Sequence, residues 1–147
     1  MELKSSEDTK KFSKVLQKGD VIFLYGEIGV GKTTFVRFLI NQLEVENSVK
    51  KSDVLSPTFN IVYDYDIKKR KILHYDLYRI KSYKDFLELG MFEKSENNII
   101  IVEWPELIKE KPINRIDIKF QYLKDKDSRK VIVSGSGNCK EYKLNEI

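Results

Sequence analysis

The sequence predicts an α/β fold, a three-layer sandwich in which helices cover both faces of a mostly parallel central sheet. Two apolar runs, residues 21–25 and 99–102, lack polar alternation, as is typical of strands buried on both faces. The first run leads through a glycine-rich turn into residues 32–43, whose apolar positions recur with a helical period. This order favours a parallel sheet covered by helices.

The segments around this unit predict further elements. Residues 6–18 place apolar side chains on one helical face, with Ser6 as the N-cap and no capping box. Residues 44–55 predict a polar surface loop. Residues 59–67 and 72–80 are rich in tyrosine and branched side chains and predict an inserted antiparallel hairpin with a basic tip. The other expected elements are a helix at 82–90, strands at 113–123 and 130–133, and a tail from 135 with at most a short strand.

Composition limits the class of protein. The 147 residues are enough for one domain, residues 1–147, and a hydrophobic content of 41% is enough for a core. The longest apolar runs fall far short of the roughly 18 residues of a membrane helix, and the N-terminus lacks the apolar stretch of a secretory signal. One cysteine, Cys139, leaves no internal disulfide. We therefore expect a soluble cytoplasmic protein with no membrane and no disulfide partner.

The segment from Gly26 to Thr33 reads GEIGVGKT and fits the phosphate-binding pattern G-x-x-x-x-G-K-[ST]. Glycines let the backbone wrap a phosphate without Cβ clashes, and the following helix directs its positive end at the anion. Lys32 can reach the β- and γ-phosphates, and the Thr33 hydroxyl can bind Mg²⁺. The pattern predicts ATP and Mg²⁺ as ligands and a P-loop NTPase-like fold. The expected nucleotide contacts are Gly26, Glu27, Ile28, Gly29, Val30, Gly31, Lys32, Thr33 and Thr34.

Two carboxylates are candidates for the chemistry beside this loop. Glu103 follows the apolar run 99–102 directly, the usual position of an acid that binds Mg²⁺, either directly or through water. On a strand, His74, Asp76 and Tyr78 share one face, and Asp76 can hold the water shell of the metal or orient the attacking water. We expect Lys32, Asp76 and Glu103 to be catalytic. Which acid positions the water is left open, and His74 is interpreted as a hydrogen-bonded structural residue.

Two further residues have alternative interpretations. Thr58, in the segment Ser56-Pro57-Thr58-Phe59, occupies a position where a threonine can sense the γ-phosphate and order a loop; otherwise the tetrapeptide is an ordinary turn before a strand. Trp104, the only tryptophan, is either a core anchor or a contact beside the nucleotide. Thr58 is included among the expected nucleotide contacts.

The segments GEIGVGKTTF, SPTF, HYDLYR, LELG and IVEWPE resemble, in order and spacing, the TsaE (YjeE) family, bacterial ATPases needed for threonylcarbamoyladenosine formation in tRNA. The resemblance extends from about residue 6 to residue 120. It implies a compact P-loop α/β domain with a hairpin inserted after the phosphate-loop helix. Thr33 and Glu103 would bind Mg²⁺, Asp76 would act beside them in hydrolysis, and Thr58 would lie in a switch-like loop.

The resemblance also implies partners. By this resemblance, the chain would hydrolyse ATP weakly alone and act with the TsaD and TsaB subunits. ATP turnover would reset the modifying complex, and tRNA would be an indirect partner. Residues 6–9 are similar to the segment that the family places beside adenine.

Two other functions remain as alternatives. A small P-loop metabolite kinase would need a lid with paired arginines, and the arginines here form no such cluster; they are Arg37, Arg70, Arg79, Arg115 and Arg129. A nucleotide-sensing RNA-binding module is supported only by the basic hairpin tip.

Overall fold

The computed structural model describes residues 2–3, 5–124 and 129–142, and these form a mixed α/β fold around a seven-stranded sheet. The strands are β1 (Glu2–Leu3), β2 (Val21–Tyr25), β3 (Val62–Ile67), β4 (Arg70–Asp76), β5 (Ile99–Glu103), β6 (Arg115–Tyr122) and β7 (Arg129–Ser136). The helices are α1 (Ser6–Val15), α2 (Lys32–Glu46) and α3 (Tyr83–Glu88), with 3₁₀ turns at Met91–Lys94, Pro105–Leu107 and Gly137–Glu141.

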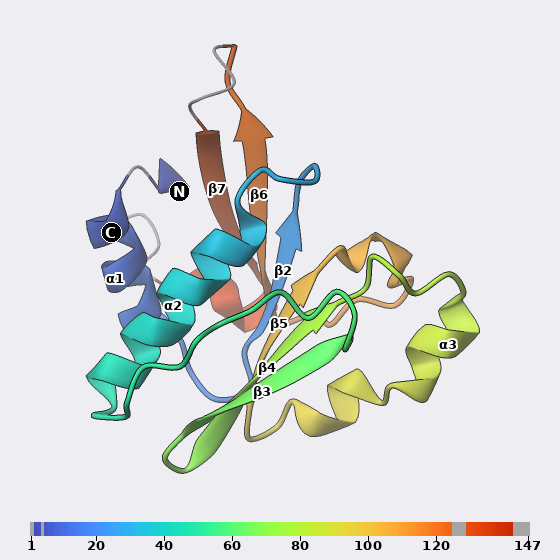
Figure 1. The fold of residues 1–147 in the computed structure, drawn as a ribbon, viewed down its shortest axis with the longest axis horizontal. Coiled ribbons are helices and arrows are strands. Elements are labelled where there is room, and N and C mark those ends of the chain that lie inside the picture. Colours follow the sequence, from blue (N-terminus) through green and yellow to red (C-terminus); the bar gives the residue numbers. More distant parts are fainter. Residues whose placement is uncertain (1, 4, 125–128, 143–147) are drawn as a thin grey trace.

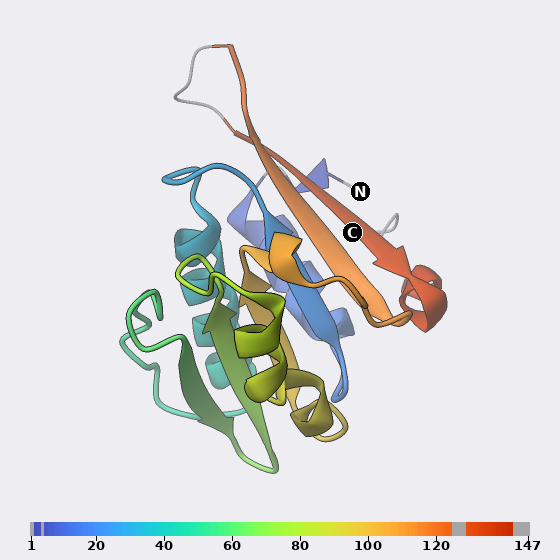
Figure 2. The same ribbon diagram turned by 90° about the vertical axis from the view of Figure 1, so that its right-hand side faces the viewer.

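The sheet is parallel at its centre and antiparallel at both sides. Its order is β1-β7-β6-β2-β5-β4-β3. Strands β6, β2, β5 and β4 run parallel, whereas β3, β7 and β1 each pair antiparallel with a neighbour. The predicted parallel centre and the inserted β3–β4 hairpin are confirmed. Figure 2 shows β6 and β7 as a long twisted pair beside β2.

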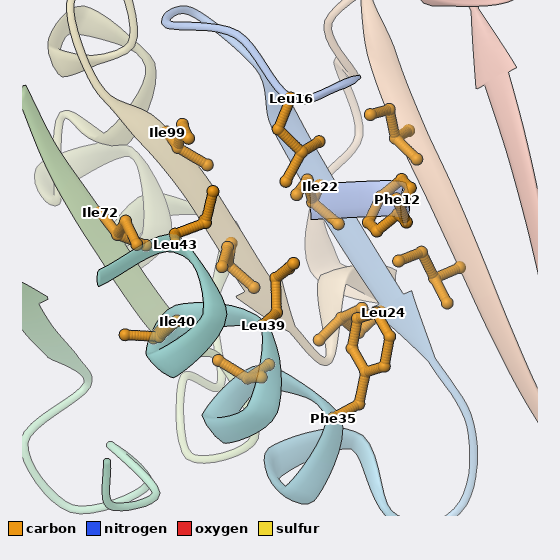
Figure 3. Close-up of a cluster of buried hydrophobic side chains, with 14 of the residues drawn as sticks. Phe12, Leu16, Ile22, Leu24, Phe35, Leu39, Ile40, Leu43, Ile72 and Ile99 are labelled. Atoms are coloured by element: carbon orange, nitrogen blue, oxygen red, sulfur yellow. The ribbon is translucent and has the colours of Figure 1, made fainter. Parts of the chain in front are cut away.

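Helices cover both faces of the sheet, with α1 and α2 on one side and α3 on the other (Figure 1). Side chains alternate across each strand, so β2 sends Ile22 and Leu24 into the core beneath α1 and α2, and Val21 and Phe23 into the second core. Figure 3 shows Ile22 and Leu24 among the helix side chains of the first core. Both faces of β2 and β5 are covered, which explains why residues 21–25 and 99–102 lack polar alternation.

Helix α1 differs from its prediction at both ends. Its N-cap is Ser5 rather than Ser6, and a capping box is present, since Asp8 N donates to Ser5 Oγ (3.2 Å) and Ser5 N donates to Asp8 Oδ2 (3.0 Å). The helix ends at Val15 instead of residue 18. The next turn is held differently, because Gln17 N donates to the carboxylate of Asp20 at 2.7 Å.

The hairpin is shorter than predicted at its outer ends. Strand β3 begins at Val62, and β4 ends at Asp76 instead of continuing to residue 80. The cause is a turn that Asp76 itself nucleates: its Oδ1 accepts a hydrogen bond from Tyr78 N (2.9 Å). Tyr78 therefore does not share a strand face with His74 and Asp76, contrary to the sequence-based expectation.

The remaining differences lie at helix ends and near the termini. Helix α2 extends to Glu46, and the side chain of Asn47 caps it by donating to Leu43 O (2.8 Å). Strand β1 was not predicted. The final strand expected in the tail, if it lies at 143–147, falls outside the described residues. Cys139 is buried and unbonded to another cysteine, and within the described ranges no helix is long and apolar enough to span a membrane.

Candidate functional site

The loop between β2 and α2 has a backbone path that requires glycine. Gly26 has φ +150° and Gly31 has φ +106°, values that favour residues without a side chain. A Cβ on Gly26 would lie 2.9 Å from Val30 Cγ1 and 3.0 Å from Phe120 O. Gly31 is the N-cap of α2 and supplies no side-chain cap hydrogen bond. The positive end of a 15-residue helix is thus left for another acceptor.

Lys32 is folded back over this loop. Its side chain is buried, and Nζ donates to Gly26 O (2.6 Å) and Glu27 O (3.0 Å) while lying 4.0 Å from the centre of the Trp104 ring. Burial lowers the pKa of Lys32, and nearby carboxylates, chiefly Glu103, oppose this shift. The ammonium is thus held by neutral carbonyls and an aromatic face. Trp104, for which two interpretations were open, contacts the loop lysine.

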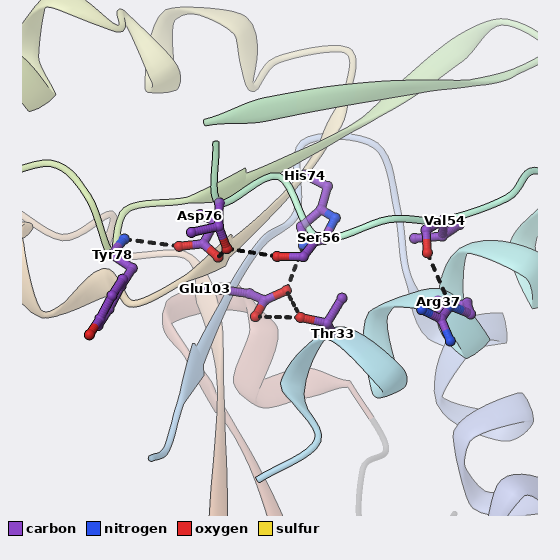
Figure 4. A network of polar contacts seen from close by, with 9 residues as sticks. Thr33, Arg37, Val54, Ser56, His74, Asp76, Tyr78 and Glu103 are labelled. Carbon is purple, nitrogen blue, oxygen red and sulfur yellow. Dashed lines mark hydrogen bonds and ion pairs between the residues drawn. The ribbon is translucent and has the colours of Figure 1, made fainter. Parts of the chain in front are cut away.

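Glu103 lies buried at the end of β5, where two side chains hold its carboxylate (Figure 4). Thr33 Oγ1 lies 3.0 and 3.1 Å from the two carboxylate oxygens, and His74 Nε2 lies 2.8 Å from Oε1. His74 is fully buried, as expected for a hydrogen-bonded histidine, but its partner is a candidate site residue. Its Nδ1 has no hydrogen-bond partner among the described residues. The carboxylate is therefore fixed in direction between α2 and β4.

Asp76 is the neighbour of Glu103 across the sheet. The parallel register of β4 and β5 pairs the two residues directly. Both carboxylates therefore lie at the carboxyl ends of their strands, side by side. Asp76 is buried, and its Oδ2 accepts a hydrogen bond from Thr58 Oγ1 (2.7 Å). Thr58 Oγ1 in turn lies 2.8 Å from Ser56 Oγ. The loop before β3 is thereby tied to the acid at the end of β4.

These groups surround one cavity of about 290 Å³, which we call the loop cavity. It is lined by Ile28, Gly29, Gly31, Lys32, Thr33, Thr34, Ser56, Thr58, Asp76, Tyr78, Glu103 and Trp104. Of the expected contacts, Gly26, Glu27 and Val30 do not line it. The first two provide the carbonyls that hold Lys32, and Val30 packs into the core.

Ser56 and Tyr78 were not among the residues expected at the site. Ser56 lies two residues from Thr58, and this adjacency was the available signal. Tyr78 was placed on a strand, and the turn at Asp76 brings it to the cavity instead. Its ring lies 4.9 Å from that of Trp104, centre to centre.

A second cavity of about 470 Å³, the helix-side cavity, adjoins the first. Gly29, Gly31 and Thr34 line both cavities. Ser6 and Thr9 of α1 contribute to the far wall, together with apolar side chains and Arg129. The segment expected beside the base thus borders a hollow next to the glycine-rich loop.

Oxygen donors predominate at the loop cavity. Within the described ranges, no group of three or more His, Cys, Asp or Glu side chains is placed to hold a metal ion. A hydroxyl and a carboxylate, Thr33 and Glu103, are instead the adjacent pair. Such hard oxygen donors suit Mg²⁺, which keeps several ligands from water or phosphate.

The family model and the relatives that match this chain all carry the same name. A family model described as "Threonylcarbamoyl adenosine biosynthesis protein TsaE" matches residues 3–131. Proteins named tRNA threonylcarbamoyladenosine biosynthesis protein TsaE are 41% identical over 111 residues in Rickettsia conorii, 39% over 135 in Aquifex aeolicus and 31% over 146 in Bacillus subtilis. These matches cover 73%, 88% and 96% of this chain. They span 61% of the Rickettsia conorii relative, 90% of the Aquifex relative and 88% of the Bacillus relative.

A solved structure has the same fold. The crystal structure of Bacillus subtilis YdiB superposes with a TM-score of 0.69 and 28% identity, covering 99% of this chain and 90% of that one. The family match extends over most of the chain and includes the glycine-rich loop, His74, Asp76 and Glu103. The chain belongs to the TsaE family.

Proposed function

We propose that this chain is an ATP-binding, weakly ATP-hydrolysing subunit required for the threonylcarbamoyl modification of adenosine in tRNA. It forms one P-loop NTPase-like domain over residues 1–147, works in the cytoplasm with TsaD and TsaB, and resets their complex, so that tRNA is an indirect partner. The observation that carries the proposal is the convergence of Lys32, Thr33, Asp76 and Glu103 on one cavity at the start of α2.

The loop residues suit a triphosphate. Lys32 Nζ is bonded to two neutral carbonyls, and charged phosphate oxygens are stronger acceptors for an ammonium group. Backbone N–H groups at the start of α2 add donors that no side chain caps. The helix-side cavity, which shares Gly29 and Gly31 with the loop cavity, provides room for the nucleoside.

Thr33 and Glu103 are proposed to hold Mg²⁺, with Glu103 acting directly or through water. When bound, the metal would neutralise charge on the phosphates. The protein prepares this position by fixing the carboxylate between Thr33 and His74. Since the described residues form no metal cage of their own, metal binding should depend on the nucleotide.

Asp76 is proposed to orient the attacking water. Its Oδ1 accepts one hydrogen bond from Tyr78 N, and its Oδ2 accepts one from Thr58. An ionised carboxylate has about four acceptor positions, so Asp76 keeps capacity to accept a hydrogen bond from the attacking water. Thr58 is placed to couple the loop before β3 to this acid.

Phosphate release measured with and without purified TsaD and TsaB tests the proposal. We expect slow turnover by the wild type alone, stimulation by the partners, and at least about a hundredfold lower rates in Lys32→Ala and Glu103→Ala. Lys109→Ala, an exposed change away from the loop cavity, is the control. Equal rates in all variants would refute the proposal.

A kinase would transfer phosphate to a metabolite instead of water. The lining of the loop cavity contains no arginine, whereas kinases commonly clamp the transferred phosphate with such side chains. Transfer of labelled γ-phosphate to an added metabolite would favour this alternative.

A further inference from the structure

The β3–β4 turn forms one wall of a hollow of about 380 Å³, which we call the basic hollow. Four cationic side chains line it, namely Lys18, Lys68, Lys69 and Arg70, together with Asn47, Asn97 and the apolar residue Ile67. No carboxylate is among its lining residues. The lining therefore carries positive charge on side chains with long aliphatic stems around Ile67, and this charge suits an anion.

The alternation of side chains along the hairpin separates its charges by face. Asp64 and Asp66 lie on the face of the hairpin that points away from α2. On that face, Lys71 Nζ lies 2.7 Å from Asp64 Oδ2 and 3.7 Å from Asp66 Oδ1. Arg70 precedes Lys71 and so points to the opposite face, toward α2. The acids of the hairpin thus neutralise Lys71 and not the cations of the basic hollow.

The cations of the basic hollow form no ion pair within the described residues. Asp20 attracts Arg70 electrostatically. However, Asp20 is buried and already accepts hydrogen bonds from Gln17 N (2.7 Å) and Tyr142 OH (2.6 Å). The positive charge of the hollow is therefore left largely for an external partner.

The backbone conformation of the β3–β4 turn does not favour lysine. Ile67 pairs with Arg70, so Lys68 and Lys69 form a two-residue hairpin loop. Lys68 has φ +54°, a left-handed conformation that such loops usually assign to Gly, Asn or Asp. Lysine is thus present at a position where its backbone conformation is unfavourable. Both cationic side chains are exposed.

The basic hollow is remote from the loop cavity. Figure 1 shows the β3–β4 turn at the opposite end of the sheet from the loop that joins β2 to α2. Strand β4 runs from Arg70, which lines the hollow, to Asp76, which lines the loop cavity. At about 3.3 Å per residue these positions are roughly 20 Å apart. Substitutions at the turn should therefore leave nucleotide binding intact.

We propose that the basic hollow binds the phosphate backbone of RNA, which adds a direct contact to the indirect partnership with tRNA through TsaD and TsaB; the inference rests on the proposed function in tRNA modification. Uncompensated cations on a projecting turn match a phosphodiester chain. No aromatic side chain lines the hollow, so bases have no stacking surface there. Binding should therefore be independent of base sequence and sensitive to salt.

Fluorescence anisotropy with a labelled tRNA transcript tests the inference on the full chain. The tip variant carries Lys68→Gln, Lys69→Gln and Arg70→Gln; the matched control carries Lys84→Gln, Lys109→Gln and Lys119→Gln, exposed lysines elsewhere. We expect at least about tenfold weaker binding by the tip variant, with a log–log salt slope lower by about two, since each lost phosphate contact lowers the slope by about 0.7. Equal affinities of the two triple variants would overturn the inference.

Competitors identify the occupant. If other RNA displaces the transcript and tripolyphosphate at the same phosphate concentration does not, the result supports an RNA backbone as the occupant of the basic hollow. Displacement by tripolyphosphate or by an acidic polyglutamate peptide at the same charge concentration would overturn it in favour of a small phosphate compound or a protein segment.

Nucleotide assays keep this inference separate from the proposed function. The tip variant should bind a fluorescent ATP analogue as the wild type does, and Lys32→Ala should bind RNA as the wild type does. Loss of analogue binding in the tip variant would indicate a folding defect and overturn the claimed independence of the sites. Absence of ATP hydrolysis in the wild type with its partners would refute the proposed function. The comparison of RNA affinity between the tip variant and the control variant would still be valid.

Discussion

His74 Nε2 lies 2.8 Å from Glu103 Oε1. Both side chains are buried, and they extend from the neighbouring parallel strands β4 and β5. Thr33 holds the same carboxylate from the opposite side. A carboxylate that binds a metal is commonly oriented by hydrogen bonds of this kind. In the proposed site, His74 is therefore a positioning residue, which acts through Glu103.

Replacing His74 tests this relationship. His74→Phe preserves most of the buried volume and removes the hydrogen bond, so Glu103 loses one of its two restraints. We expect the Mg²⁺ concentration for half-maximal phosphate release to rise by about 10- to 100-fold, with a smaller change in ATP affinity. His74→Gln, which retains an N–H donor, should recover part of the effect. An unchanged Mg²⁺ dependence in a folded His74→Phe protein would contradict the role.

Amide substitutions should separate the two acids. Glu103→Gln retains an oxygen for Thr33 but loses the charge that favours Mg²⁺, so nucleotide binding should lose its dependence on Mg²⁺. Asp76→Asn should retain Mg²⁺-dependent nucleotide binding and lower hydrolysis by about a hundredfold or more. Titration calorimetry with a non-hydrolysable ATP analogue and phosphate release measure the two effects. The reverse pattern would exchange the proposed roles.

Thr58→Val should loosen the loop before β3. The change is nearly isosteric and removes the 2.7 Å hydrogen bond to Asp76 and the contact with Ser56. We expect faster amide exchange across residues 55–60 and a lower hydrolysis rate. Ser52→Ala is the control, because it removes the hydrogen bond that Ser52 Oγ donates to Glu44 Oε1 at the other end of the same segment. Identical exchange in wild type and Thr58→Val would show that the bond does not order the loop.

Tyr142→Phe should destabilise the fold in a pH-dependent manner. Burial raises the pKa of Asp20, and the hydrogen bond from Tyr142 partly opposes this rise. Removing the hydroxyl deprives the buried Asp20 carboxylate of one hydrogen bond. This loss should lower the free energy of unfolding by about 1–2 kcal/mol at neutral pH.

The sign of the pH dependence follows from this raised pKa. The hydroxyl stabilises the ionised form of Asp20, so the cost of Tyr142→Phe should be largest above the pKa of Asp20 and decrease as the pH falls through it. Urea unfolding at several pH values measures the difference. Tyr83→Phe serves as control, since no hydrogen bond of the Tyr83 hydroxyl is found in the described part of the chain. A cost independent of pH would contradict the assignment.

The elements that the sequence predicts well are those whose pattern has a local cause. Strand β2 and residues 99–102 of β5 are apolar because both faces of these strands are covered. Helix α2 follows from its period and from the glycine-rich loop before it. The capping box of Ser5 and Asp8 also has a local cause, a serine with an acid three residues later. The prediction was wrong here, because it placed the N-cap at Ser6 and expected no capping box.

Features that depend on distant pairing could not be predicted in the same way. Strand β1 has only two residues and exists through its pairing with β7. The contact of His74 with Glu103 depends on the parallel register of β4 and β5, which no local pattern encodes. The end of β4 was misplaced because the bond from Tyr78 N to the Asp76 side chain competes with strand hydrogen bonding.

The order of the sheet has a consequence for self-association. Among the described strands, only β1 and β3 have a single neighbour. The first is two residues long, and the second presents the exposed charges of Asp64 and Asp66 along its outer face. Short or charged borders discourage a second copy from adding its own strand. Neither outermost strand of the described sheet therefore offers a second copy a long, uncharged border to pair with.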